Sequence, residues 1–142
     1  LWNVCDTRVP FSRHTLQRIL EATVPDIYAE KQLRLVVCSI DDERPVGFVD
    51  LYDFSPIHHR CGVGVIIYPA TEREKGYASE ALTAFLPDMM DQLNVTEVEG
   101  VCLRENAASV RVLEKCGFRR VFDGEGPYQG QIRAITRMIY SK

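Results

Sequence analysis

Apolar and polar positions along the chain follow two different periods, one typical of strands and one of helices. The apolar runs 33–40, 46–54 and 61–68 are rich in β-branched residues and predict three strands. The polar segment DDERP separates the first two runs, so we expect those strands to form an antiparallel hairpin. The segment SPIHHR is expected to form the loop that leads to the third strand.

Helical spacing appears on both sides of these strands. The segment 10–31 predicts a helix that Ser12 caps and Pro25 splits in two. A second helix is expected from Tyr77 to about Leu93, with Pro87 causing a kink or an early end. One face of this second helix carries apolar residues at intervals of three and four, namely Ala78, Ala81, Leu82, Phe85, Leu86, Met89 and Met90.

The last third of the chain continues the alternation of strands and helices. A strand is expected over 96–103, then a short helix that Asn106 opens and Gly117 closes. Two more strands follow, near 118–122 and 132–140. This order of elements predicts an α/β (α+β) layer fold on a mixed sheet.

Composition and charge narrow the class of protein. The chain has 142 residues, 46% hydrophobic, with a net charge of −3, which fits one ordinary globular domain. No basic face of the kind that binds nucleic acid stands out, and the longest apolar run is too short to cross a membrane. We therefore expect neither a nucleic-acid nor a membrane partner.

The five cysteines are scattered and form no C-x-x-C pair. A zinc site or a disulfide framework is therefore not expected, and no metal is assigned. Reduced thiols in the cytoplasm are the better interpretation, because disulfides persist mainly in oxidising compartments.

The segment that joins the third strand to the second helix is a candidate anion site. The first N–H groups of a helix have no partner within it, and the helix dipole adds positive charge there. Gly76 would let a ligand approach the backbone, and Arg73 and Lys75 would add charge. The alternative is a solvated turn whose glycine only relieves strain. No G-x-x-x-x-G-K-[ST] phosphate loop is present.

Two motifs resemble the GNAT superfamily of acetyl-CoA-dependent N-acetyltransferases. Arg73-Glu-Lys-Gly76-Tyr-Ala78 fits its R/Q-x-x-G-x-G/A motif, and the segment 105–118 is similar to N-x-x-[AS]-x-x-x-[YL]-x-K-x-G-F. The segments VGFVDLYDFSPIHHR and GQIRAITRM resemble the branch that holds bacterial diamine and spermidine acetyltransferases and ribosomal-protein N-terminal acetyltransferases. The resemblance implies a single domain over 1–142 with a mixed, mostly antiparallel sheet flanked by helices. It also implies that the usual first strand and helix are missing from an incomplete N-terminus.

The resemblance implies acetyl-CoA as co-substrate. Its pantetheine arm would lie along the third strand, its pyrophosphate on the amides of 73–79, and Asn106 would bind the arm. The implied cofactor-binding residues are Ile66, Ile67, Tyr68, Arg73, Glu74, Lys75, Gly76, Tyr77, Ala78, Ser79, Asn106 and Lys115. The alternative for Asn106 is a plain helix cap, and for Lys115 a solvated side chain. Glu72 and Glu74 would oppose the phosphates.

Two positions depart from the family pattern and leave catalysis open. Leu113 stands where relatives often have a tyrosine that protonates the leaving thiolate. Gly62 stands where many relatives have a glutamate that acts as a general base through water. The backbone N–H near Ile67 would face the acetyl oxygen. Asp50 and His58 are candidates to replace the missing acid and base, and so are Asp53 and His59. Asp50 and Asp53 are three residues apart, so they face opposite sides of their strand if it is regular. The alternative is that all four are solvent-facing.

The expected reaction is acetyl transfer to a primary amine, with a diamine or polyamine slightly ahead of a peptide N-terminus. Negative charge at Asp50, Asp53 and 41–43 would attract a polyamine. Arg133 and Arg137 could instead hold a carboxylate or a peptide backbone. A CoA-binding module with little turnover is a further alternative, and a homodimer is a candidate assembly.

Overall fold

The computed structural model of the protein describes residues 26–142. Most of the helix expected over 10–31, including Ser12 and Pro25, lies outside the described residues. Within them the short helix α2 spans Ile27–Glu30 and begins at Asp26, whose carboxylate accepts a hydrogen bond from the Tyr28 N–H at 2.9 Å.

Six strands form one mixed sheet in the order β1-β2-β3-β4-β6-β5. They are β1 (Leu33–Cys38), β2 (Pro45–Ser55), β3 (Arg60–Ile67), β4 (Glu97–Leu103), β5 (Arg119–Tyr128) and β6 (Gln131–Ser141). Only the β3–β4 pair is parallel, so the expectation of a mixed, mostly antiparallel sheet is confirmed. The hairpin of β1 and β2 is also confirmed.

Two longer helices follow strands that lie side by side. The helix α3 spans Tyr77–Leu93, and α4 spans Ala107–Lys115, with Asn106 as its cap and Gly117 just beyond its end at φ +96°. The expected early end at Pro87 is wrong, because α3 continues six residues past it to Leu93. Pro87 is exposed, while Leu86, Met89 and Met90 are buried around it, so packing on both sides of the proline holds the helix together.

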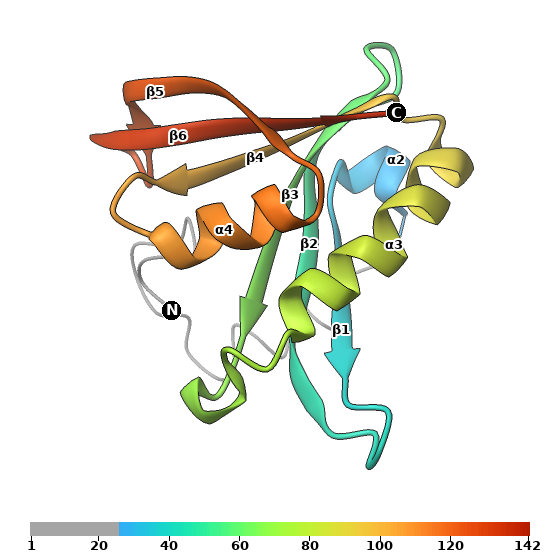
Figure 1. The fold of residues 1–142 in the computed structure, drawn as a ribbon. Coiled ribbons are helices and arrows are strands. Elements are labelled where there is room, and N and C mark those ends of the chain that lie inside the picture. Colours follow the sequence, from blue (N-terminus) through green and yellow to red (C-terminus); the bar gives the residue numbers. More distant parts are fainter. Residues whose placement is uncertain (1–25) are drawn as a thin grey trace, which may run out of the picture.

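The hydrophobic core lies between these helices and one face of the sheet. It includes Leu51, Leu82, Met90, Val98 and Met138, each at most 1% exposed. Figure 1 shows α3 and α4 on this face, and it shows the β1–β3 and β4–β6 halves of the sheet spreading apart from a shared end. The separation of β3 from β4 forms the gap at which the candidate site is found.

Candidate active site

The gap opens because β3 and β4 pair over only three positions. Arg60 lies opposite Glu97, Cys61 opposite Val98 and Gly62 opposite Glu99, after which the ladder ends. β3 runs on to Ile67, so its backbone groups beyond Gly62 on the β4 side have no strand partner within the described sheet. Unpaired backbone donors are available for a ligand, because backbone N–H groups require a partner.

Ile67 presents its amide to this gap. The Tyr68 N–H donates to the Val46 oxygen at 2.8 Å, which directs Tyr68 toward β2. Because successive residues of a strand direct their backbone groups to opposite sides, the Ile67 and Val65 N–H groups point toward the gap. The Ile67 oxygen accepts a hydrogen bond from the Arg73 Nε at 3.2 Å, which ties the following turn to the end of β3.

The turn after β3 brings the predicted anion-binding residues together. A single 3-10 turn over Ala70–Glu72 precedes Gly76, which caps α3 with φ at +87°. The first residues of α3 carry N–H groups without a partner inside the helix. Arg73, Glu74 and Lys75 are exposed beside them. Sequence and structure therefore agree on a strand, a charged turn and a helix N-terminus.

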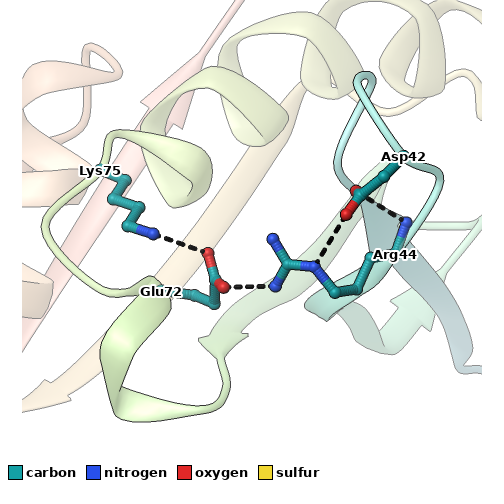
Figure 2. Close-up of polar contacts among 4 residues, drawn as sticks. All are labelled: Asp42, Arg44, Glu72 and Lys75. Atoms are coloured by element: carbon teal, nitrogen blue, oxygen red, sulfur yellow. Dashed lines mark hydrogen bonds and ion pairs between the residues drawn. The ribbon is translucent and has the colours of Figure 1, made fainter.

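A buried carboxylate holds this turn in place (Figure 2). Glu72 is only 6% exposed and accepts hydrogen bonds from the Arg44 guanidinium and, at 3.1 Å, from the Lys75 Nζ. The hydrogen bond from Arg44, followed by that from Lys75, lowers the pKa of Glu72. Arg44 also donates to Asp42 at 3.1 Å. Two cations thus offset the negative charge of Glu72, which the sequence alone predicts to repel the cofactor phosphates.

Asn106 lies at the same end of the gap as Ile67. Because β3 and β4 are parallel, their carboxyl ends share one end of the sheet, and Asn106 follows β4 directly. Its side chain accepts a hydrogen bond from the Ser109 N–H at 3.2 Å, so its role as a helix cap is confirmed. A hollow of about 270 Å³ lies next to it, lined by Leu103, Arg104, Glu105, Arg133 and Ala134.

Lys115 lies at the far end of α4, close to the first turn of α3. The neighbouring Cys116 thiol donates to the Ser79 oxygen at 3.6 Å and accepts from the Thr83 hydroxyl at 3.7 Å. The Lys115 side chain is exposed. The two ends of α4 therefore flank the gap and the turn respectively.

The predicted catalytic residues do not gather at one point. His58 is exposed in the loop before β3, nine residues from Ile67, which corresponds to roughly 30 Å along an extended strand. Asp50 lies on β2 opposite Gly64 and accepts two hydrogen bonds from Arg34, at 2.6 and 2.9 Å. The strand is not regular around Asp53, which has φ +50° at a shift of the β2–β3 register. The prediction that Asp50 and Asp53 face opposite sides holds only for a regular strand, so it does not apply here.

The two positions that depart from the family pattern are both tightly packed. Leu113 is 5% exposed, and a Cβ added at Gly100 of β4 would lie 2.7 Å from its Cδ1 atom. A Cβ added at Gly62 would lie 2.1 Å from the Tyr52 ring. Tyr52 thus occupies the space that a side chain at position 62 would need. Sequence reasoning missed Tyr52, and only its place two residues from the centre of an apolar strand pointed to it.

The described part of the chain holds neither a metal cluster nor a helix that could span a membrane. No group of three or more His, Cys, Asp and Glu side chains within residues 26–142 lies close enough to hold a metal ion. None of the helices in this part of the chain is both long and apolar enough to cross a membrane.

Comparison with known proteins agrees with the motifs and the fold. Residues 2–119 match the family model of the acetyltransferase (GNAT) domain. The chain is 32% identical over 80 residues to the uncharacterized N-acetyltransferase YnaD of Bacillus subtilis, a match that covers 56% of this chain and 46% of YnaD. It is 24% identical over 123 residues to YoaA of the same organism, which covers 81% of this chain and 69% of YoaA. The chain thus spans about half the length of YnaD.

Solved structures share the fold over nearly the whole chain. A spermidine N-acetyltransferase from Vibrio cholerae, solved with CoA and spermine, superposes with a TM-score of 0.81 at 21% identity and covers 98% of this chain and 80% of its own. A protein described as a ribosomal-protein-serine acetyltransferase, also from Vibrio cholerae, gives 0.75 at 25% identity, covering 93% and 76%. With most of its length matched by the family model, the chain belongs to the GNAT acetyltransferase family.

Proposed function

We propose that this protein transfers the acetyl group of acetyl-CoA to a primary amine, with a diamine or polyamine as the preferred acceptor. The observation that carries the proposal is the gap between β3 and β4, which ends at the Gly76 turn and the N-terminus of α3. A strand with unpaired amides that leads to an anion-binding helix end suits a ligand with a long amide-bearing arm and a pyrophosphate.

The cofactor would be held at both ends of the gap. The amides of Tyr77, Ala78 and Ser79, with Arg73 and Lys75, would bind the pyrophosphate. The pantetheine arm would pair with the backbone of β3 at Val65 and Ile67. Asn106 would bind the arm from the β4 side, and Lys115 would approach the distal phosphate from beside α3.

In the proposed reaction a neutral amine attacks the thioester carbonyl carbon. The new C–N bond forms as the carbonyl electrons move to oxygen, and the C–S bond then breaks as the carbonyl re-forms, which releases the CoA thiolate. The nitrogen loses one proton to solvent, and the thiolate takes one up, so the products are the amide and the CoA thiol. The Ile67 N–H, which points into the gap, is the proposed donor to the oxyanion. Both oxygens of Asp50 accept hydrogen bonds from Arg34. This ion pair favours a structural role for Asp50 beside the acceptor over a role in proton transfer.

The acceptor class rests on charge. Arg34 neutralises Asp50, so the negative charge that would attract a polycation comes from the exposed Asp53 on β2 and from Glu99 on β4. Arg137 donates only to Oε2 of Glu99. The likeness to the ribosomal-protein-serine acetyltransferase favours a peptide N-terminus as the second candidate. Arg133 forms an ion pair with Glu105, and Arg137 forms one with Glu99. Both arginines already have a carboxylate partner within the protein, which disfavours binding of a substrate carboxylate.

The test combines CoA calorimetry with a thiol-release assay on spermidine, butylamine and a peptide with a free N-terminus. We expect CoA binding, and a kcat/KM for spermidine above that for butylamine that shrinks as salt rises. A protein that binds CoA but acetylates none of the three would contradict the enzyme proposal. A preference for the peptide that does not depend on salt would replace the polyamine with the second candidate.

A further inference from the structure

Three residues on neighbouring strands form a row across the sheet at the closed end of the gap. Tyr52 on β2 lies opposite Gly62 on β3, and Gly62 lies opposite Glu99 on β4. Side chains in one such row share a face of the sheet. Gly100, the next residue along β4, faces Leu113 of α4, so the row lies on the face away from α3 and α4.

Gly62 allows the two outer side chains to approach one another. A Cβ at position 62 would lie 2.1 Å from Cε2 and 2.4 Å from Cζ of Tyr52. Cζ carries the phenol oxygen, so the polar end of Tyr52 lies over β3 and is directed toward β4. Burial raises the pKa of Tyr52, and the nearby Glu99 carboxylate raises it further, so the phenol stays protonated.

The Glu99 carboxylate is held in place through one of its two oxygens. The Arg137 guanidinium donates to its Oε2 atom at 2.6 Å, and the Glu99 side chain remains 33% exposed. Among the described residues its hydrogen bonds use only Oε2, which leaves Oε1 as an acceptor. This carboxylate lies at the last paired position before β3 and β4 separate.

We propose that Tyr52 and Glu99 form part of the acceptor site, where Glu99 Oε1 and the Tyr52 hydroxyl bind a charged ammonium group of a diamine or polyamine other than the nitrogen that attacks the thioester. Gly62 lies five residues, roughly 16 Å of extended strand, from Ile67, so this row binds the distal end of the acceptor. The inference rests on the proposed acetyl transfer and adds to it the place where the acceptor binds. A carboxylate and a phenol oxygen both accept hydrogen bonds, and an ammonium group donates three. The ring of Tyr52 provides an apolar surface for the carbon chain next to that group.

The experiment measures steady-state kinetics with spermidine, and CoA affinity by calorimetry, for Glu99→Gln, Tyr52→Phe and Glu97→Gln. Glu97 lies two residues from Glu99 on the same strand and face, so Glu97→Gln removes the same charge without touching the row. Tyr52→Phe keeps the ring that packs on Gly62. The same variants are measured with butylamine, which has no second ammonium group, so its KM should stay within about twofold of the wild-type value in all three.

We expect Glu99→Gln to raise the KM of spermidine about tenfold or more, because a charged hydrogen bond is lost. Tyr52→Phe should raise it by roughly three- to tenfold, and Glu97→Gln by less than about twofold. The affinity for CoA should stay within about twofold in all three, because the row lies away from the Gly76 turn.

Equal increases in KM for Glu99→Gln and Glu97→Gln would overturn the proposal. They would show that the amine responds only to the overall electrostatic field of the protein. An unchanged KM in Tyr52→Phe together with Glu99→Gln would overturn it as well. If Glu99→Gln fails to fold, Tyr52→Phe decides alone. A wild-type protein that binds CoA but acetylates no amine contradicts the proposed function itself, which is a distinct result.

Discussion

The Arg44 guanidinium forms an ion pair with the buried carboxylate of Glu72, 28 residues further along the chain. The contact joins the turn between β1 and β2 to the turn that precedes α3. Lys75 approaches the same carboxylate from the other side, as Figure 2 shows. The geometry of the proposed pyrophosphate site therefore depends on a hairpin that contributes no residue to it.

Glu72→Gln should lower the free energy of unfolding at neutral pH and flatten its decline in acid. The pKa of Glu72 is lowered from 4.5 by Arg44 and Lys75, so the folded state keeps the carboxylate charged where the unfolded chain takes up a proton. Its stabilisation is complete above pH 4.5 and is lost as the pH falls through the lowered pKa. Urea denaturation across this range checks the prediction. Glu74→Gln, at an exposed position of the same turn, is the control and should change little.

Gly76→Val should weaken CoA binding by about tenfold or more, because side-chain atoms would hold the pyrophosphate away from the helix N-terminus. The substitution also costs about 1–2 kcal/mol of backbone strain at φ +87°. Gly130→Val is the matched control, since Gly130 has φ +68° in the distant β5–β6 turn. Both variants should be less stable, and only Gly76→Val should lose affinity in calorimetry. Equal affinities would place the anion site elsewhere.

Leu113→Ala should destabilise the protein by about 2–5 kcal/mol through the cavity that it leaves against Gly100. The pH dependence of kcat should not change, because a leucine cannot transfer a proton. Leu113→Met conserves volume and should cost less than about 1.5 kcal/mol. Denaturation and a pH–rate profile of both variants test this, and a shifted profile in Leu113→Met would assign position 113 a part in the chemistry.

The free energy of unfolding should fall as the pH rises from about 9 to about 11. Burial raises the pKa values of Cys61 and Cys102 to about 11, whereas the unfolded thiols titrate near 9.0. Between these values the unfolded chain releases protons that the folded chain retains, so stability present below pH 9 is lost, by up to about 2–3 kcal/mol per thiol. Cys61→Ala should reduce the slope.

The same burial predicts an order of reaction with thiol reagents. Cys38 is exposed, so an alkylating reagent should modify it in the native state while Cys61 and Cys102 are protected. Mass spectrometry of the alkylated chain distinguishes the three sites. Rapid native-state labelling of Cys61 would contradict its placement in the core.

The sequence by itself determined the elements and the strand–turn–helix arrangement of the proposed cofactor site, because both depend on local patterns. The three- and four-residue spacing located α3 from Tyr77 to Leu93, and Asn106 and Gly117 marked both ends of α4. The order strand, charged turn, glycine and helix predicts an anion site, since the amides at a helix N-terminus are unpaired whatever surrounds them.

Only the tertiary structure decided which side chains meet. Strand register pairs Arg34 with Asp50 and places Tyr52 and Glu99 on either side of Gly62. The ion pair of Arg44 with Glu72 depends on how two turns far apart in sequence come together. From its charge alone, Glu72 is expected to repel the cofactor phosphates, whereas packing buries it between two cations. Local propensity carries no information on the strand contacts, because a register shift of one residue would move the side chains of the shifted strand to the other face.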